Sequence, residues 1–333
     1  MSDPGAGRVL IVSSPRSGST WTLRVLSCAE GASFVREPDN VDTQASVTAA
    51  VTRLGFGPYP VIEPGQAAPQ YAALWDLAFQ GRRALRLRRG WGRRVARAAF
   101  RLPRPVRDPL LAIAARGLGV VAPRRSRVVV SSVMAHFSAE WIHARFGPRV
   151  VVLQRDPLNI ASSWLRLDVN AYDVHTRPAI VDRHLRPLGV EPPPHGASNT
   201  TLVGWWIGAL ATQLGSLLEG HPDWILATHE DLCEAAEERF GDLYQRLDLT
   251  WTSETDAYLR EGGYIEPLFR GGANTFAASA GDAAEATRVR REQVDAWRTR
   301  LTPDQLVDLR AVLATFPNGG WVRPRATRGD QVP

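Results

Sequence analysis

The chain has 333 residues, of which 44% are hydrophobic and 22% are charged, as in an ordinary globular protein. This length suits one large unit with insertions better than two independent cores, so we expect a single domain over residues 1–333. No apolar run approaches the roughly eighteen residues of a transmembrane helix, and the N-terminus does not fit a secretory signal, so we expect a soluble, cytoplasmic protein. Two cysteines without metal-ligand spacing predict neither a disulfide framework nor a metal site.

The charge of the chain is uneven. The net charge is +6 at pH 7, and all 40 basic residues are arginine. Because lysine is absent, the sequence excludes Schiff-base chemistry and the usual phosphate-loop lysine, and a cation at a reaction centre must be a guanidinium. Eleven arginines and no acid lie within residues 82–107, so the basic character belongs to one segment.

The predicted elements alternate between strands and helices. An apolar run at 9–12 predicts the first strand, and helical spacing follows at 19–30. Further strands are predicted at 128–130, 150–153 and 224–227, and further helices at 160–167, 201–218, 232–247 and 293–313. This alternation predicts an α/β fold, a parallel sheet flanked by helices.

Two segments are interpreted as insertions. Residues 71–123 contain the arginine cluster, and apolar residues on helical spacing at 82–102 predict a basic amphipathic helix. Three roles are open for it: a lid for an anionic or lipid-like acceptor, a contact with a membrane surface or nucleic acid through 82–107, or a solvated cationic helix. Residues 174–199 are rich in proline and histidine and predict an irregular loop.

A glycine-containing loop at 13–21 joins the first strand to the first helix. In this context successive backbone amides and the helix N-terminus bind an anion. Gly18 allows close approach of a phosphate, and Ser17, Ser19 and Thr20 add hydroxyl donors. A Walker A loop needs a lysine and a different glycine spacing, so magnesium-ATP chemistry is disfavoured, and a serine-rich connector without a ligand is the alternative.

The loop Pro15-Arg16-Ser17-Gly18-Ser19-Thr20 resembles the 5′-phosphosulfate-binding loop of sulfotransferases. These enzymes use 3′-phosphoadenosine-5′-phosphosulfate (PAPS), and the resemblance implies their P-loop NTPase-like fold, with helical and loop insertions. It implies that Arg16 takes the place of the catalytic lysine, as in many bacterial members, that Ser17 to Thr20 hold the phosphosulfate, and that Trp21 stacks on adenine. Because arginine does not give up its proton, we assign Arg16 charge stabilisation only.

A second motif follows the predicted strand at 150–153, at the edge where open α/β sheets bind ligands. It resembles the 3′-phosphate motif of the same family, in which an arginine and a serine eight residues later hold the phosphate. Arg155 and Ser163 have this separation. Alone, the motif can also be a helix start with an exposed Arg-Asp pair. The two motifs together predict that both phosphorylated ends of one nucleotide are held.

Weaker resemblance extends further along the chain. Residues 228–232 are similar to the Y-E-D-L segment of the family, with His229 in place of tyrosine, and we interpret His229 as a surface residue. Residues 294–303 resemble the C-terminal region of the family. Arg288, Arg290 and Arg291 are either additional 3′-phosphate contacts or part of a solvated basic face.

The proton of the acceptor needs a base. Glu37 lies at the distance from the loop at which a glutamate serves in Golgi-type members, and its alternative is a surface Arg-Glu pair. His136 lies on the segment that carries the histidine of cytosolic members, and its alternative is a helix-capping residue. Glu140 is a third candidate.

The sequence therefore predicts a metal-independent sulfotransferase that moves a sulfonate group from PAPS to a hydroxyl or similar nucleophile, with PAP as the second product. The acceptor is a small molecule, a glycan or a lipid, and no sequence-specific nucleic-acid partner is expected. A P-loop-like kinase and a non-catalytic anion-binding module are the alternatives. The sequence gives no indication of the acceptor's identity or of the oligomeric state.

Overall fold

The structure is a computed structural model that describes residues 7–40, 58–82, 102–103, 106, 126–167, 173–260 and 290–320. It contains a five-stranded sheet with the order β2-β3-β1-β4-β5. The strands are β1 (Arg8–Ser13), β2 (Ala32–Arg36), β3 (Arg127–Ser132), β4 (Arg149–Gln154) and β5 (Ile225–Thr228). The predicted α/β fold with a parallel, helix-flanked sheet is confirmed.

The chain divides into two compact units. The first contains Met1–Ser13 and Thr22–Val150, and the second contains Ser14–Trp21 and Val151–Pro333. The loop of the first motif therefore belongs to the same unit as the second motif. The expectation of a single domain over 1–333 stays a prediction.

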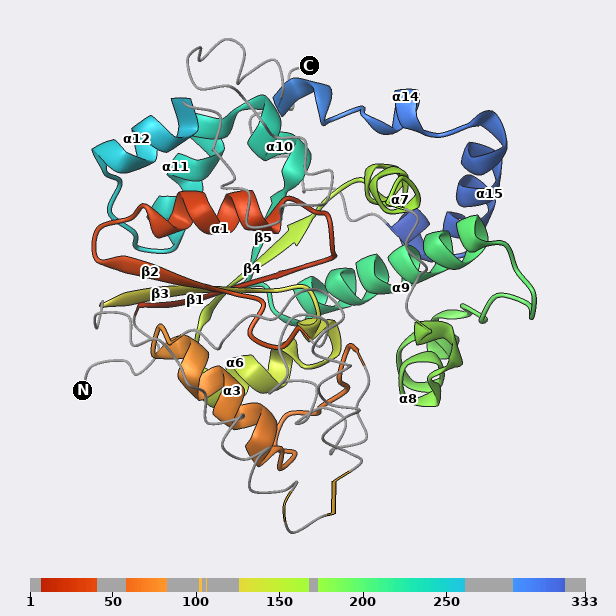
Figure 1. The fold of residues 1–333 in the computed structure, drawn as a ribbon, viewed down its shortest axis with the longest axis horizontal. Helices are drawn as coiled ribbons and strands as arrows, with labels where there is room; N and C mark the ends of the chain where they lie inside the picture. Colours follow the sequence, from red (N-terminus) through yellow and green to blue (C-terminus); the bar gives the residue numbers. More distant parts are fainter. Residues whose placement is uncertain are drawn as a thin grey trace. The chain divides into compact units, whose positions relative to one another are not determined.

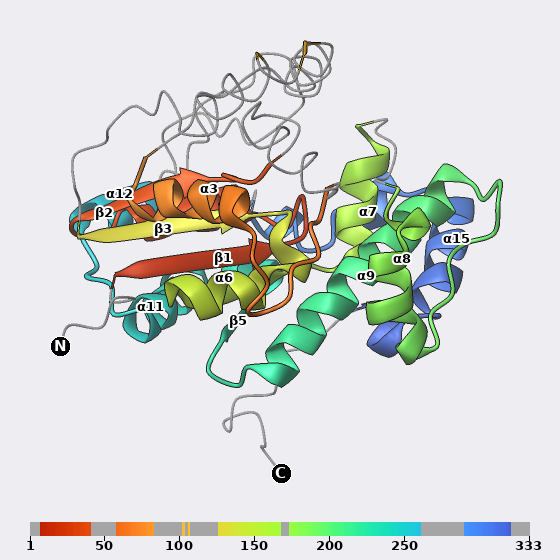
Figure 2. The same cartoon turned by 90° about the horizontal axis from the view of Figure 1, so that it is seen from below.

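Three parallel strands organise the first unit. In the register, Leu10 of β1 lies opposite Val130 of β3, and Phe34 of β2 lies opposite Val129. Helices α3 (Pro69–Phe79) and α6 (Ala139–Phe146) lie on one side of these strands (Figures 1 and 2), and α1 (Ser19–Ser27) lies on the other (Figure 1). Strand β2 was not predicted, because it is a short edge strand with only two buried positions and no continuous apolar run.

An aromatic cluster fixes α3 against α6. The rings of Tyr71, Trp75 and Phe79 follow one another along α3. From α6, Trp141 contacts Tyr71 at 5.6 Å and Phe146 contacts Phe79 at 5.5 Å between ring centroids. The beginning of the predicted insertion at 71–123 is therefore a core helix. Apart from residues 102, 103 and 106, the part of this insertion from 83 to 123 lies outside the described residues, so the basic helix stays a prediction.

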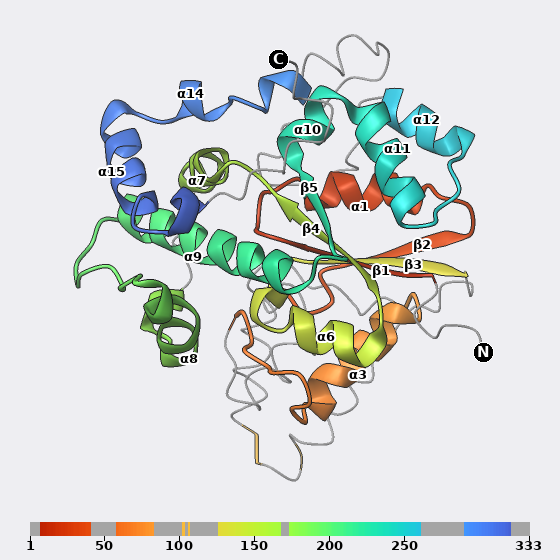
Figure 3. The same cartoon turned by 180° about the vertical axis from the view of Figure 1, so that it is seen from behind.

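The second unit is built on β4 and β5, with Val151 opposite Ile225. Helices α7 (Pro157–Leu165), α9 (Asn199–Gly220) and α15 (Pro303–Leu313) pack together (Figure 3). A Cβ atom on Gly208 of α9 would lie 2.5 Å from the ring of Phe316, which precedes the short helix η5 (Pro317–Gly320). Small residues on α9 therefore permit this close packing.

Two predicted helices are divided in the structure. The prediction at 232–247 corresponds to α10 (His229–Glu234) and α11 (Ala236–Arg246), which is followed by α12 (Ser253–Arg260). The prediction at 293–313 corresponds to α14 (Trp297–Arg300) and α15. Thr302 is in an extended conformation and forms a capping box with Gln305 at the start of α15, so a new helix begins there.

The predicted irregular loop at 174–199 is wrong for its first half. Short helical turns run through η2 (Val174–Thr176), α8 (Pro178–Ile180), η3 (Val181–Leu185) and η4 (Arg186–Leu188). Val174, Ile180, Val181 and Leu185 are at most 3% exposed. Their burial explains why this segment coils against the unit although its composition suggests a loop.

Helix α9 is long and apolar enough to cross a membrane by length and composition alone. Of its most apolar window, 78% is buried inside the structure. This burial is what a core helix of a globular domain shows.

Candidate active site

The loop of the first motif is a tight turn that places Arg16 in an unusual conformation. Ser17 donates to the Ser14 carbonyl through its backbone N–H (3.3 Å) and through its hydroxyl (2.6 Å). Arg16 has a φ of 71°. Pro15 and a positive φ one residue later are typical of a type II turn, in which the second position normally favours glycine. Left-handed backbone at a non-glycine residue costs roughly 1 to 2 kcal/mol, and residues in such conformations cluster at functional sites, so this φ makes Arg16 a candidate site residue.

Gly18 brings the loop into contact with His229. Its φ is 84°, and a Cβ atom here would lie 2.3 Å from Nδ1 of His229. Helix α1 begins directly afterwards at Ser19, and the side chains of Ser17 and Ser19 are buried. The chain therefore presents successive amides at a helix N-terminus with no room for a side chain at Gly18, which is a geometry that suits an anion.

The interpretation of His229 as a surface residue is wrong. His229 is 3% exposed, and its Nε2 lies 3.4 Å from the sulfur of Cys233. Burial, together with the charge of Arg155, holds the pKa of His229 well below its usual value, so the imidazole is neutral. The sequence signal was its position: His229 follows β5 as Arg155 follows β4, and the ends of parallel strands meet at one edge of a sheet.

Trp21 is packed among rings. It is 8% exposed and makes edge contacts with Phe240 at 5.1 Å and with His229 at 6.1 Å between ring centroids. Its Nε1 is buried and has no hydrogen-bond partner in the described part of the chain. The stacking of Trp21 on adenine stays a prediction.

Arg155 connects the second motif to the loop. It is 8% exposed, which rules out the alternative of an exposed Arg-Asp pair. Its Nη1 donates to the carbonyl of Arg16 (2.9 Å) and its Nη2 to the carbonyl of Gln293 (3.1 Å). Its Nε is buried and lacks a partner among the residues that the structure covers. Because a buried N–H needs an acceptor, this orphan donor suits an anion, which a guanidinium can bind bidentately.

Ser163 makes the second connection. Its hydroxyl accepts a 2.9 Å hydrogen bond from Nε of Arg16, across 147 positions of sequence. Pro157 begins α7, and Asp156 caps it by accepting from the backbone N–H of Leu158 at 2.7 Å. The structure thus brings Arg16, Arg155 and Ser163 together, and the two motifs form one cationic site.

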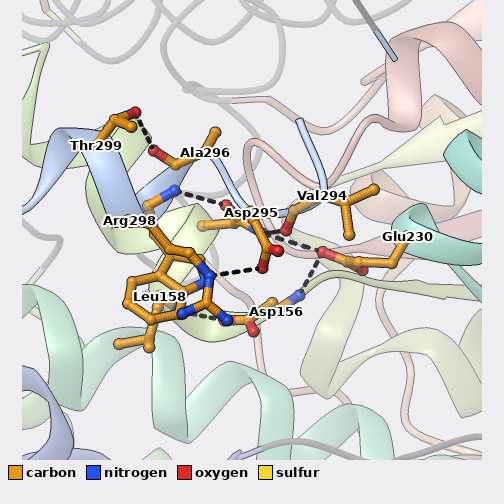
Figure 4. A network of polar contacts seen from close by, with 10 residues as sticks. Asp156, Leu158, Glu230, Val294, Asp295, Ala296, Arg298 and Thr299 are labelled. Atoms are coloured by element: carbon orange, nitrogen blue, oxygen red, sulfur yellow. Dashed lines mark hydrogen bonds and ion pairs between the residues drawn. The ribbon is translucent and has the colours of Figure 1, made fainter. Parts of the chain in front are cut away.

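Glu230 supports the start of α7 through two hydrogen bonds. Its Oε1 accepts from the backbone N–H of Asp156 (3.1 Å) and from Nδ2 of Asn159 (3.2 Å), as Figure 4 shows in part. Burial raises the pKa of Glu230 to about 7, and the nearby Arg155 partly opposes this rise. Sequence reasoning missed the role of Glu230, although it lies in the Y-E-D-L-like segment.

The three arginines that the sequence offers as further 3′-phosphate contacts are not equally buried or described. Arg290 is half-buried and donates to the carbonyl of Leu259 at 2.8 Å, whereas Arg291 is exposed. Arg288 lies outside the described residues. Their contacts with a 3′-phosphate stay predictions.

The first candidate base, Glu37, follows β2. Its backbone N–H donates to Ser131 at 2.7 Å, its φ is 50°, and its Oε2 accepts from Nδ2 of Asn40 at 2.7 Å. Its Oε1 lies 3.8 Å from Nε of Arg36, with the two side chains only 15% and 13% exposed. The Arg-Glu pair therefore exists, but it is largely buried.

The second candidate base, His136, lies inside the short helix η1 (Ala135–Phe137) and is fully buried. Its ring contacts that of Tyr59 at 5.5 Å. Burial lowers the pKa of His136 to about 3, which makes it a poor proton acceptor at neutral pH. Arg16 belongs to the second unit, whereas Glu37 and His136 belong to the first. Which of these two residues is the base stays a prediction.

The carboxyl group of Asp39, two residues after Glu37, is buried, and the sequence did not predict this. Asp39 is 1% exposed and accepts from the hydroxyls of Ser132 (2.8 Å) and Tyr71 (3.1 Å). Burial raises the pKa of Asp39 to about 6. The sequence around Asp39 is typical of a surface turn, so no local signal predicts this burial. Among the residues described, no three His, Cys, Asp or Glu side chains are grouped so that they could hold a metal ion.

Comparison with known proteins gives structural neighbours only. No family model and no curated protein matches the sequence. A sulfotransferase domain from the curacin biosynthetic pathway aligns with a TM-score of 0.44 and 16% identity, over 92% of this chain and 97% of that domain. A sulfotransferase domain from the Synechococcus PCC 7002 olefin synthase aligns with a TM-score of 0.41 and 14% identity, over 91% of this chain and 93% of that domain. Because both TM-scores are below 0.5, these alignments do not bear on the function of this chain. The fold of the chain is α/β with a parallel sheet.

Proposed function

We propose that the chain is a sulfotransferase that moves the sulfonate group of PAPS to a hydroxyl or similar nucleophile of a small-molecule, glycan or lipid acceptor. The observation that carries the proposal is the direct connection of the two motifs. Arg155 binds the loop carbonyl of Arg16 and retains a buried, orphan Nε, while Ser163 binds the Arg16 side chain. One ligand with two anionic groups suits this arrangement better than two separate anions.

The loop and Arg16 act on the leaving group in this proposal. The acceptor oxygen forms a bond to sulfur while the bond from sulfur to the bridging oxygen of the 5′-phosphate breaks, so negative charge develops on that oxygen. In this proposal the amides of the loop and the guanidinium of Arg16 stabilise this charge. Glu37 or His136 takes the proton of the acceptor.

Arg155 and Ser163 act on the donor at a distance from the reacting atoms. The Nε of Arg155 and the hydroxyl hydrogen of Ser163 bind the 3′-phosphate of the nucleotide. Ser163 can do so because its oxygen is the acceptor in its contact with Arg16, which leaves its own hydrogen to donate. A phosphate at this position separates a PAPS user from an ATP user.

Nucleotide binding tests the proposal directly. Isothermal titration of the purified chain with 3′,5′-ADP, without metal, is expected to give at least about tenfold tighter binding than titration with ATP and Mg²⁺, equivalent to roughly 1.4 kcal/mol. A kinase-like protein gives the opposite order, and a general anion-binding module binds both nucleotides equally. Either result would overturn the proposal.

The acceptor class is tested by transfer. Incubation with PAPS labelled on sulfur, together with fractionated small molecules, glycans and lipids, is expected to label one class. Release of PAP without a labelled product in any fraction would contradict the transfer reaction.

A further inference from the structure

Asn159 is a fully buried amide that uses all of its hydrogen-bonding groups. It lies in the first turn of α7 and is 0% exposed. Its Nδ2 donates to the carbonyl of Val294 (2.6 Å) and to Oε1 of Glu230 (3.2 Å), and its Oδ1 accepts from the backbone N–H of Trp297 (3.1 Å). Two of these three partners belong to the segment 293–297, which Figure 4 shows beside the start of α7.

The same segment is bound by Arg155. The carbonyl of Gln293 accepts from Nη2 of Arg155 at 3.1 Å, and the side chain of Gln293 accepts from Arg300 at 3.2 Å. At the other end, Trp297 is 8% exposed, and Arg298 lies over its ring at 4.6 Å. Segment 293–297 is therefore docked at both ends, and one of its docking contacts fixes the orientation of the anion-binding arginine.

We propose that Asn159 is a positioning residue of the donor site, which docks segment 293–297 onto α7 so that Gln293 holds Arg155 with Nε directed at the 3′-phosphate. This inference rests on the proposed function. With Arg16 and Gln293 accepting from Nη1 and Nη2, the guanidinium can rotate little, and its Nε is buried and has no partner among the residues that the structure describes. Without the docked segment, Arg155 loses one of these two contacts.

Coupling between the segment and the ligand follows from this geometry. Because the docked segment favours the binding orientation of Arg155, binding of the 3′-phosphate must favour the docked segment by the same free energy. A residue with a purely structural role would change stability without this selectivity for one phosphate. A positioning role and a purely structural role of Asn159 therefore differ in how strongly they affect binding of a nucleotide with the 3′-phosphate compared with one that lacks it.

Substitution of Asn159 by alanine tests the selectivity. In titration calorimetry, Asn159→Ala is expected to weaken 3′,5′-ADP at least about tenfold and 5′-AMP, which lacks the 3′-phosphate, by less than about threefold. Ser198→Ala is the matched control, because Ser198 caps α9 in the same unit and has no part in these contacts. It is expected to lower the Tm and leave both affinities unchanged. Equal weakening of the two nucleotides by Asn159→Ala would overturn the inference.

A second substitution keeps the size of the side chain. Asn159→Asp retains an acceptor for Trp297 but loses both donors and places a carboxylate beside Glu230, so 3′,5′-ADP affinity should fall again. Adding Glu230→Gln restores a donor across this contact and is expected to recover part of the affinity. No recovery in the double variant would contradict the direct role of the contact between residues 159 and 230.

Hydrogen exchange separates this inference from the proposed function. Without nucleotide, the Trp297 amide is expected to exchange at least about tenfold faster in Asn159→Ala, since its acceptor is gone. In the unsubstituted chain, 3′,5′-ADP should slow the exchange of the 293–297 amides. If the chain does not bind 3′,5′-ADP, the proposed function fails while Trp297 exchange still tests the docking. If it binds and Asn159→Ala binds equally well, this inference fails and the function stands.

Discussion

At the scale of single residues, Arg16 shows how charge and backbone conformation combine in the site. Its left-handed φ is a conformation that glycine would adopt without cost, and its side chain is held by Ser163. A strained residue that keeps a large cationic side chain indicates that this side chain is needed where it lies. The resemblance of the loop predicted that Arg16 stabilises charge, but no pattern in the sequence predicted its contact with Ser163.

Replacement of Arg16 tests its assigned role. Arg16→Ala is expected to lower kcat/KM at least about a hundredfold, roughly 3 kcal/mol, because the developing charge on the leaving oxygen loses its cation. The measurement is the initial rate of sulfonate transfer to the acceptor identified by labelling. Arg260→Ala, at an exposed arginine at the end of α12, is the control and should leave the rate unchanged. An unaffected rate in Arg16→Ala would remove the guanidinium from the mechanism.

The two candidate bases make opposite predictions. We expect Glu37→Gln to depress kcat while leaving the affinity for 3′,5′-ADP nearly intact, because the amide cannot take a proton. His136→Ala should instead act mainly on stability, since this ring is buried and its pKa lies near 3. Steady-state rates, nucleotide titrations and melting curves of both variants distinguish the two effects. If His136→Ala removes turnover in a stable protein, the base assignment moves to the histidine.

At the scale of elements, the long periodic patterns were predictable and the contacts between elements were not. Strands β1, β3, β4 and β5 each contain three or more consecutive apolar residues, which is typical of a strand buried on both faces, so these strands can be recognised from the sequence. Strand β2 is short and half-exposed, and the segment around Ile180 buries apolar residues within a proline-rich composition. In both of these segments, tertiary contacts and not the local sequence pattern determine the structure. The burial of His229 under the loop is another such contact.

The contact between the loop and α10 gives a prediction about this pair of elements. Gly18→Ala is expected to weaken 3′,5′-ADP binding at least about tenfold, because the added methyl group meets the His229 ring and the loop must move. The double variant Gly18→Ala with His229→Ala removes the steric conflict and should recover part of the affinity, leaving the cost of the positive φ. The readout is titration calorimetry of both variants and of His229→Ala alone. Full affinity in Gly18→Ala would show that the loop does not bind the nucleotide through its backbone.

At the scale of the whole molecule, the order of the motifs along the chain determined what could be predicted. Two phosphate-binding patterns, each after an apolar strand, predict a common sheet edge, and the structure places Arg155 and Ser163 in hydrogen-bonding contact with Arg16. The contacts among buried polar side chains could not be predicted in the same way. The buried polar cluster of Asp39, Tyr71 and Ser132 draws on three separate segments, each with an unremarkable local sequence.

This buried cluster links the stability of the fold to pH. Asp39 has a folded-state pKa of about 6 and an ordinary value of 3.8, so folding raises it. A group of this kind contributes stability that is fully present below pH 3.8 and is lost as the pH rises through about 6. The loss from Asp39 alone is on the order of 3 kcal/mol, and Glu230, whose pKa rises from 4.5 to about 7, acts in the same direction.

Asp39→Asn removes this dependence at one position. An amide of the same size can keep the contacts with Ser132 and Tyr71 without carrying a charge into the core, so the variant is expected to lose less stability than the unsubstituted chain between pH 4 and 7.5. Urea unfolding of both proteins at both pH values measures how much more stability the unsubstituted chain loses than the variant, and all other titrating groups cancel in this comparison. The expected size is roughly 2 kcal/mol, because the unfolded-state carboxyl is already partly ionised at pH 4. Glu219→Gln, at an exposed carboxylate on α9, serves as the control and should give a difference near zero. An equal pH response in Asp39→Asn and the unsubstituted chain would mean that Asp39 is not buried as a carboxyl group, and that the segment after Glu37 is held by other contacts.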